Sequence, residues 1–287
     1  MDSGTVNGGH KKRLPPAKHR DPYGKRPDTS EDTDDNNGSV IEGRNAVIEA
    51  LRAGITIDKV FIAKGETDAT LRHIASVARA SGAAVVDADR HKLDSMSVTH
   101  AHQGVIAAAA CANYVEIGDM LEIAKQKGNP PLLVMCDGIS DPHNLGAMIR
   151  TCEAAGADGI IIPKRRNAGL TATVAKASSG AVYHTAVARV TNLSATIHEL
   201  KDAGIWVFGA SADGSTSLWD ADFKNPTALV IGSEGAGLSR LVRENCDFCV
   251  NIPMAGRLKS LNASVSAAIL LYEAVRQRKK IKKTIES

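Results

Sequence analysis

The chain has 287 residues, of which 43% are hydrophobic, enough for one large domain or two modest ones. Its net charge of +3 neither requires nor excludes a nucleic-acid partner. No apolar run reaches membrane-spanning length and no signal-peptide pattern opens the chain, so we expect a cytoplasmic protein. Five cysteines, an odd number in a long chain, exclude a disulfide framework.

The first 39 residues contain almost no large apolar side chains and are rich in Gly, Pro, Asp and Lys. Such a segment cannot bury enough surface to fold, so residues 1–39 are predicted to be a disordered tail. Basic residues between Lys11 and Arg26 precede acidic residues between Asp28 and Asp35. We interpret the segment as a solvated tail, and a basic arm that grips RNA is the alternative.

Residues 40–115 are predicted to form a small α/β domain, because helical and strand-like apolar patterns alternate along them. The expected helices cover 45–54, 68–82 and 91–97, and the expected strands cover 58–65, 83–88 and 104–111. Alternation of this kind indicates a layered α/β fold.

Residues 116–287 are predicted to form a second, larger domain. A connecting helix over 116–130 ends in Gly-Asn-Pro-Pro. The expected strands then cover 132–138, 159–163, 206–211, 228–232 and 248–253, and the expected helices cover 144–155, 169–178, 192–203, 238–244 and a long stretch from Ser264. Nearly continuous apolar strands separated by helices predict a parallel sheet covered on both faces.

Three of the strand ends in this larger domain are turns rich in Gly or containing Pro: "FGASADG", "IGSEGAGLS" and "IPMAGRLKSLN". Ligands of parallel sheets bind beyond the carboxyl ends of the strands, so these turns predict a pocket lined by main chain. Gly232, Gly235 and Gly237 have the wrong order for a dinucleotide fingerprint, and no Walker A lysine follows a glycine run. Ordinary strand-to-helix turns would explain one such turn but explain three poorly.

The same stretches carry a resemblance to a known family. "DPHNLGAMIRTCEAAG" (141–156), "LVIGSEGAGLSRLV" (229–242) and "IPMAGRLKSLNASVSAAILLYEAVRQR" (252–278) resemble, in order and spacing, the three signature motifs of the SpoU, or TrmH, family of SPOUT-class RNA ribose 2′-O-methyltransferases. "VIEGRNAVIEALRAG" and "HAHQGVIA" resemble the small substrate-binding domain of the bacterial large-subunit ribosomal RNA guanosine methyltransferases in that family.

The resemblance implies a SPOUT domain whose C-terminal segment threads a loop to form a trefoil knot, preceded by a small RNA-binding domain. It implies S-adenosyl-L-methionine as cofactor and a homodimer joined through the C-terminal domain. The cofactor-binding residues that it implies are Gly209, Ala210, Gly232, Ile252, Pro253, Met254 and Leu261. Lys259, which precedes Ser-Leu-Asn, departs from the acidic or small neutral residue that family members often carry there.

Methyl transfer to a ribose hydroxyl needs positioning of the hydroxyl and removal of its proton. The catalytic residues that the resemblance implies are Asn144, Arg150, Glu234, Ser260 and Asn262. The family's proposed base is the arginine, yet a guanidinium almost never loses its proton, so Arg150 is either the base or a clamp on an RNA phosphate. Ser260 and Asn262 are expected to cap the following helix and, with the motif, also to shape the pocket.

The predicted activity is therefore methylation of a ribose 2′-hydroxyl in RNA, with a guanosine of large-subunit ribosomal RNA as the expected target. A transfer RNA enzyme and a non-catalytic ribosome-assembly factor are the alternatives, and the glycine order disfavours a nicotinamide oxidoreductase. No metal site is expected, because Cys246 and Cys249 form one C-x-x-C without a second half. His102 and His143 are interpreted as structural rather than as bases.

Overall fold

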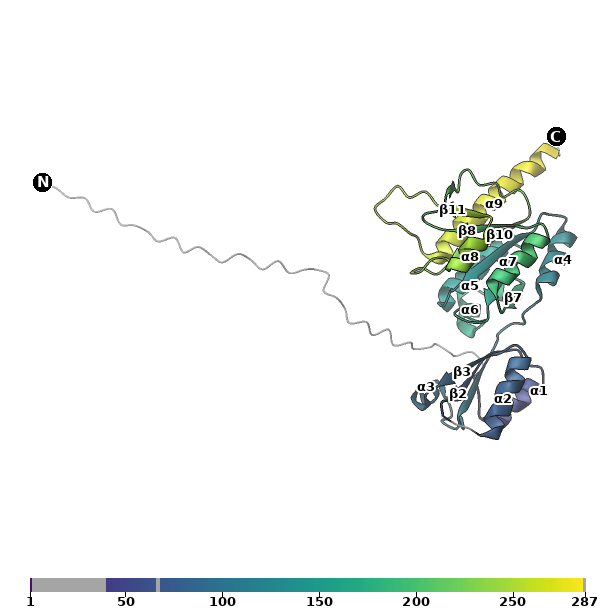
Figure 1. Cartoon of the computed structure of the whole chain (residues 1–287), viewed down its shortest axis with the longest axis vertical. Coiled ribbons are helices and arrows are strands. Elements are labelled where there is room, and N and C mark those ends of the chain that lie inside the picture. Colours follow the sequence, from purple (N-terminus) through teal and green to yellow (C-terminus); the bar gives the residue numbers. More distant parts are fainter. Residues whose placement is uncertain (2–39, 66–67, 286–287) are drawn as a thin grey trace. The chain divides into compact units, whose positions relative to one another are not determined.

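The computed structural model describes residues 1, 40–65 and 68–285, and the side chains among them up to residue 279 (Figure 1). The predicted disordered tail and its charged segments therefore lie, except for Met1, outside the described residues. No helix in the described part of the chain is long and apolar enough to cross a membrane.

The small domain is built on a four-stranded mixed sheet in the order β1-β4-β2-β3. Its strands are β1 (Val40–Glu42), β2 (Ile57–Ala63), β3 (Ala84–Ala88) and β4 (Val105–Ala109), and its helices are α1 (Arg44–Arg52), α2 (Ala69–Ala80) and α3 (Arg90–Met96). β2 and β3 are parallel, whereas β4 runs antiparallel to β1 and β2. The three expected helices and three expected strands are present, and the short β1 was not expected.

The larger domain contains a seven-stranded sheet in the order β7-β6-β5-β10-β8-β11-β9. Its strands are β5 (Leu132–Asp137), β6 (Gly159–Pro163), β7 (Val187–Val190), β8 (Trp206–Ala210), β9 (Thr216–Ser217), β10 (Thr227–Gly232) and β11 (Phe248–Asn251). Every neighbouring pair is parallel, which confirms the predicted parallel sheet. β7 and β9 were not expected, because their apolar patterns are short.

Helices cover both faces of this sheet, as the apolar strands predict (Figure 1). The helices are α4 (Ile117–Lys127), α5 (Pro142–Ala155), α6 (Ala172–Ala177), α7 (Leu193–Asp202), α8 (Arg240–Asn245) and α9 (Ala263–Ile285). α5, α6 and α9 pack against one face, and α4, α7 and α8 against the other. Alternate residues of β5 supply the two cores: Val134 and Cys136 face α5 and α9, whereas Leu133 and Met135 face α4 and α7.

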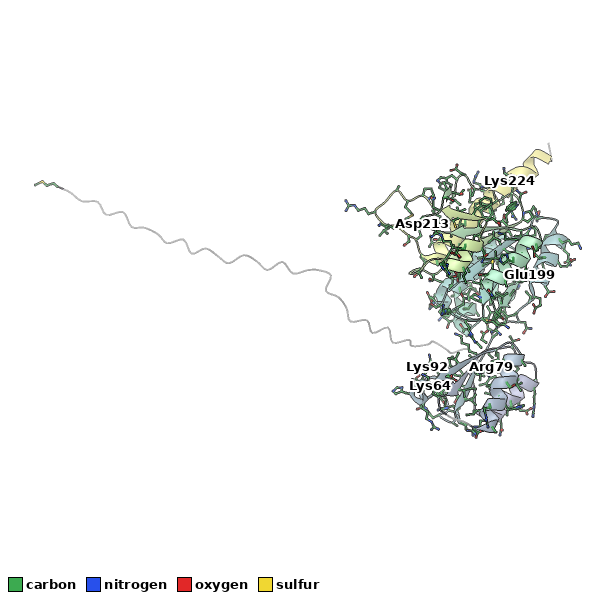
Figure 2. The ribbon with its side chains drawn as sticks, viewed as in Figure 1. Lys64, Arg79, Lys92, Glu199, Asp213 and Lys224 are labelled. Carbon is green, nitrogen blue, oxygen red and sulfur yellow. The ribbon has the colours of Figure 1, made fainter. Side chains whose placement is uncertain are left out.

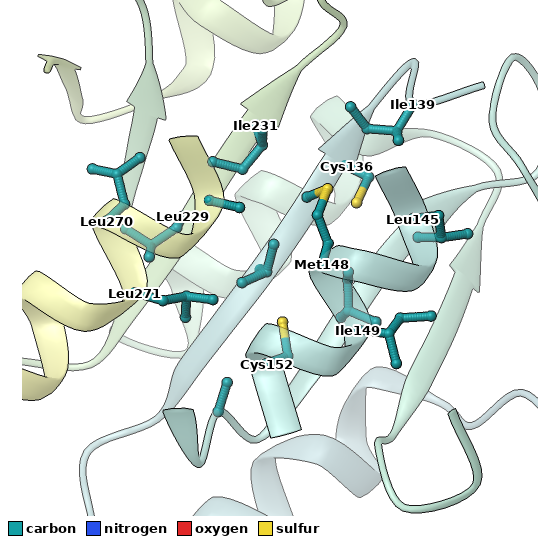
Figure 3. Packing of buried hydrophobic residues seen from close by; sticks show 14 of the residues in the cluster. Cys136, Ile139, Leu145, Met148, Ile149, Cys152, Leu229, Ile231, Leu270 and Leu271 are labelled. Carbon is teal, nitrogen blue, oxygen red and sulfur yellow. The ribbon is translucent and has the colours of Figure 1, made fainter. Parts of the chain in front are cut away.

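Figure 3 shows the first of these cores, where α5 and α9 meet the sheet. Met148 and Cys152 of α5 and Leu271 of α9 are fully buried beside strand residues such as Leu229. Each fully buried aliphatic side chain of this size stabilises the fold by about 1.5–3 kcal/mol relative to exposure. This packing fixes the beginnings of α5 and α9 at the carboxyl edge of the sheet.

A buried ion pair connects strand β2 with strand β7. Arg189 donates to Asp58 over 2.7 Å, and the two side chains are only 9% and 3% exposed. The Tyr114 hydroxyl also donates to Asp58, and the Arg189 guanidinium lies 4.3 Å from the centre of the Tyr114 ring. Burial raises the pKa of Asp58, although Tyr114 and Arg189 act in the opposite direction.

Candidate active site

Three loops at the carboxyl edge of the large sheet enclose a cavity of about 880 Å³. They follow β8, β10 and β11, the strand ends at which the sequence predicts a pocket. Because the strands are parallel and adjacent, their carboxyl ends meet at one edge. Main chain forms much of the wall, since the loops are rich in Gly, Ala and Ser.

The loop after β10 is a tight turn that closes on its own strand. Ser233 and Gly237 exchange main-chain hydrogen bonds of 3.1 and 2.9 Å, and Gly237 has a φ of 66° that favours glycine. A side chain on Gly232 would collide with the main chain of Gly237 and Leu238. Gly232 is therefore required by the close approach of this turn.

The loop after β11, residues 252–262, supplies the facing wall of the cavity. Within the described chain, residues 253–261 make no hydrogen bonds with other main-chain groups. The loop ends at Asn262, whose Oδ1 accepts hydrogen bonds from the main-chain N–H of Ser264 and Val265, at 2.9 and 3.3 Å, and caps α9. The loop thus presents unpaired main-chain donors and acceptors to a ligand.

Six of the seven residues predicted to bind the cofactor line this cavity: Ala210, Gly232, Ile252, Pro253, Met254 and Leu261. The seventh, Gly209, is not part of the cavity wall. It lies inside β8, where an added Cβ would stand 2.7 Å from Leu238 and 2.9 Å from the Cys246 sulfur. The position needs glycine because the β10–α8 loop and α8 pack directly on the strand.

Two of the predicted catalytic residues, Asn144 and Asn262, converge on a third, Glu234, at the same edge. The Asn144 amide donates to Glu234 Oε1 over 3.1 Å, and the Asn262 amide donates to the same oxygen. Asn262 also donates to Asn144 Oδ1 over 2.9 Å. Residues 118 positions apart in the chain are thereby joined around one carboxylate oxygen.

Local sequence explains how Asn144 reaches this position. Asp141 caps α5 by accepting a 2.8 Å hydrogen bond from the His143 N–H, and Pro142 occupies the first turn of the helix. Asn144 therefore lies in the first turn of α5, the helix that follows β5 after a short loop.

The other two predicted catalytic residues make no hydrogen bond with this cluster in the described structure. Arg150 is exposed on α5, six residues or about 9 Å along the helix from Asn144. Ser260 is exposed in the wall of the cavity. His102, one of the histidines interpreted as structural, is buried in the small domain, where it contacts Asp94 at 3.0 Å.

Three charged residues in or beside the cavity were not expected from the sequence. Asp213, after β8, pairs with Arg243 of α8 at 3.0 Å, and both line the cavity. Asp137, at the end of β5, accepts a 2.6 Å hydrogen bond from the Ser239 N–H and secures the loop after β10. An aspartate at or shortly after the end of a predicted strand was the available signal for Asp137 and Asp213.

The two cysteines of the C-x-x-C motif are free. Burial raises the pKa of the Cys246 thiol to about 12, and the thiol donates to the Val242 carbonyl. No cluster of three or more His, Cys, Asp or Glu side chains suited to a metal ion occurs among the described residues.

A parallel α/β sheet with a main-chain-lined cavity and a carboxylate–amide cluster at its carboxyl edge defines a ligand-binding enzyme domain. Residues 131–272 match the SpoU rRNA Methylase family, and residues 40–115 match the family described as RNA 2′-O ribose methyltransferase substrate binding. The chain belongs to the SpoU methylase family and is an RNA methyltransferase.

Named relatives are consistent with this assignment. The chain is 47% identical over 238 residues to "Putative TrmH family tRNA/rRNA methyltransferase YacO" of Bacillus subtilis, covering 83% of this chain and 95% of that one. It is 45% identical to an "Uncharacterized tRNA/rRNA methyltransferase" of Mycolicibacterium vanbaalenii, over 86% of this chain and 78% of that one.

Among solved structures, the SpoU methyltransferase AviRb from Streptomyces viridochromogenes, in complex with AdoMet, is similar with a TM-score of 0.53 and 28% identity. The match covers 84% of this chain and 90% of AviRb. An AdoMet-bound rRNA methyltransferase from Sinorhizobium meliloti has a TM-score of 0.51 and 27% identity, over 85% and 88% of the two chains.

The cofactor is S-adenosyl-L-methionine, and the cavity fits it. Unpaired main-chain groups of residues 253–261 suit the polar edge of an adenine ring, and apolar side chains such as Ile252 and Leu261 suit its faces. Asp213 and Arg257 place both signs of charge at the wall, as the amino and carboxylate groups of the methionine part require.

Proposed function

We propose that this enzyme methylates a ribose 2′-hydroxyl in RNA, with a guanosine of large-subunit ribosomal RNA as its target. The observation that carries the proposal is the Asn144–Glu234–Asn262 cluster beside the cavity. A hydroxyl is a weak acid and needs an acceptor for its proton, and Glu234 is a carboxylate at the wall of the cavity. When bound, the cofactor supplies an electrophilic methyl group.

In this proposal Glu234 orients the hydroxyl and accepts its hydrogen bond. Both asparagine amides donate to Oε1, which leaves Oε2 available to the substrate. The amides hold the carboxylate in one orientation, and this preorganisation lowers the cost of aligning the reacting oxygen. Asn262 also caps α9, so the beginning of that helix and the orientation of Glu234 depend on one side chain.

Arg150 has the role of a phosphate clamp rather than of a base in this proposal. It is exposed, it lies about 9 Å along α5 from Asn144, and a guanidinium retains its proton. A bidentate contact with an RNA phosphate uses the geometry that this side chain offers.

Purified enzyme with labelled S-adenosylmethionine tests the reaction and the substrate together. Large-subunit ribosomal RNA and transfer RNA are offered in parallel, and the product is digested to nucleosides and separated by mass. We expect 2′-O-methylguanosine from ribosomal RNA only. A base-methylated nucleoside contradicts the reaction, whereas labelled transfer RNA contradicts only the substrate.

Two substitutions separate the proposed roles. Glu234→Gln keeps the shape but removes the acceptor charge, so we expect kcat to fall at least a hundredfold while cofactor affinity stays within a few-fold. Arg150→Ala removes one phosphate contact that positions the ribose, so we expect turnover to fail while the cofactor binds normally and RNA still binds, about tenfold more weakly. Unchanged kcat in Glu234→Gln contradicts the role of the carboxylate.

The protein is also proposed to be a symmetric dimer joined through the large domain. Val265 and Tyr272, seven residues apart on α9, are 45% and 51% exposed, and Leu258 of the adjoining loop is 74% exposed. Such an apolar stripe beside the cavity suits a second copy of the chain. Light scattering should give twice the chain mass, and Val265→Asp should give monomers.

We further propose that the segment 252–262 is the threaded part of a trefoil knot. The last strand, β11, lies near one edge of the sheet, yet α9 returns to pack on α5 and on the central strand β10. The intervening loop must therefore cross back over the carboxyl edge. In such a knot, the loops after β10 and β11, which form the two walls of the cavity, would be threaded through one another.

A further inference from the structure

A cationic segment follows β6 at the same edge of the sheet as the Asn144–Glu234–Asn262 cluster. Residues 164–166 are Lys-Arg-Arg, and Arg165 and Arg166 are exposed whereas Lys164 is half-buried. Within the described chain, neither arginine forms an ion pair with a carboxylate. Both guanidinium groups are therefore available to pair with an anionic ligand at this edge of the sheet.

The segment is fixed to the loop that leads into α5. Asn167 is 6% exposed, and its Oδ1 accepts a 2.8 Å hydrogen bond from the Ile139 N–H. The Ala168 N–H donates to the Ile139 carbonyl over 2.8 Å, and the Asn167 amide donates to the Ala168 carbonyl over 3.0 Å. A buried side chain therefore holds the main chain of the two arginines against the loop after β5.

Arg166 adopts a main-chain conformation that an arginine rarely takes. Its φ is 59°, in the left-handed region, which costs about 1–2 kcal/mol for a residue with a Cβ. The hydrogen bonds of Asn167 and Ala168 offset this cost. The conformation of Arg166 is thus held by the structure around it rather than by the residue's own preference.

The distance to the cavity is short. A Cβ placed on Gly138 would lie 3.7 Å from the Ser233 side chain and 3.9 Å from the Arg166 carbonyl. Ser233 lines the cavity and precedes Glu234. A single glycine thus separates the main chain of Arg166 from the cavity wall, on the side away from β8 and β11.

We propose that Arg165 and Arg166 bind the phosphates that flank the target nucleotide, and that Asn167 is the positioning residue that aims them. The proposal rests on RNA being the substrate of this site. Every ribose in a chain lies between two phosphates, and guanidinium groups pair with phosphate oxygens through two parallel hydrogen bonds. Contacts of this kind set register without reading sequence.

The test measures binding of in vitro transcribed large-subunit ribosomal RNA over a range of salt concentrations. Arg165→Ala, Arg166→Ala and the double variant are compared with Lys224→Ala, which removes an exposed cation just before β10, at the opposite edge of the sheet. Each arginine substitution should weaken RNA binding about tenfold or more. It should also make the negative slope of the logarithm of the association constant against the logarithm of salt concentration shallower by about 0.7–0.9. Cofactor affinity should not change.

Asn167→Ala separates aiming from charge. Both cations remain in this variant, so the salt dependence of RNA binding should stay near that of the natural protein while kcat/KM for RNA falls. The unfolding temperature of each variant is measured in parallel. Arg166→Gly serves as a comparison, because glycine favours the loop conformation but removes the charge. The proposal is overturned if the double arginine variant binds and methylates RNA like Lys224→Ala. If the natural protein methylates a base while the arginine variants still lose RNA affinity, the proposed reaction fails and the phosphate contact stands.

Discussion

At the scale of single residues, Gly232 shows how a motif residue acts through the chain's own packing. Its hydrogen faces the main chain of Gly237 and Leu238, so any side chain displaces the turn that walls the cavity. The sequence pattern indicates that a ligand approaches the main chain at Gly232. In the structure, the atoms nearest to a Cβ at this position are main-chain atoms of the loop that follows β10.

Gly232→Ala should therefore be enough to abolish cofactor binding, because a single added Cβ collides with main chain. Calorimetric titration with S-adenosylmethionine measures the effect. Gly118→Ala is the control, because its added methyl group on α4 would meet nothing within 4 Å. Normal affinity in Gly232→Ala would show that the turn can move without consequence.

Glu42 is a second residue with a definite local role. Partial burial acts to raise its pKa, but hydrogen bonds from the hydroxyls of Ser97 and Thr99 and from the N–H groups of Val98 and Thr99 outweigh it and lower the pKa to about 2. A lowered pKa means that the folded state favours the ionised form, so stability from Glu42 is complete above pH 4.5 and disappears as pH falls towards 2.

Glu42→Gln should accordingly lower the unfolding temperature at pH 7. The difference in unfolding temperature between the variant and the natural protein should shrink as pH falls from 4.5 to 2. Thermal unfolding followed by circular dichroism gives both curves. A gap that does not vary with pH would mean that the carboxylate charge contributes nothing to the loop over residues 97–99.

At the scale of secondary-structure elements, an ion pair joins β2 and β7, which belong to different sheets. Asp58 and Arg189 are both nearly buried, and Asp58 Oδ2 is a buried oxygen without a hydrogen-bond partner in the described structure. Removing one member of such a pair leaves the other charged and desolvated, which is costlier than never having the pair.

Arg189→Met should destabilise the protein by about 3–5 kcal/mol. Arg52→Met removes an exposed pair with Glu49, in which both side chains are more than two-thirds exposed, and should cost less than about 1 kcal/mol. Urea denaturation compares the two. Equal losses would indicate that the buried pair is no stronger than a surface one, and recovery in the Asp58→Leu/Arg189→Met double variant would assign the loss to the orphaned charge.

At the scale of the whole molecule, we expect binding of the cofactor and choice of the RNA to depend on different parts of the chain. All the residues that line the cavity belong to the large domain. The small domain matches the substrate-binding family and has its own two cores. A pocket that accepts one ribose cannot by itself select a site in a long RNA.

A fragment of residues 110–287 should therefore bind S-adenosylmethionine within a few-fold of the full chain and fail to methylate ribosomal RNA. The cut is placed before Val115, because its N–H donates 2.9 Å to the Val187 carbonyl and extends the sheet beside β7. Calorimetry and methyl transfer measure the two activities. Normal methylation by the fragment would show that the small domain does not select the RNA.

The sequence by itself determined the α/β class, the parallel sheet and the pocket at its carboxyl edge, because apolar periodicity and Gly-rich turns are local signals. The family resemblance named seven cofactor residues, six of which line the cavity. It also marked Asn144, Glu234 and Asn262. Only the tertiary structure decided that these three share one carboxylate oxygen, that Gly209 lies outside the cavity, and that Asn167 holds the segment after β6 against the loop after β5. The hydrogen bonds concerned join residues 28 to 118 positions apart in the chain. They depend on how distant elements pack, which the periodicity of a short stretch of sequence does not encode.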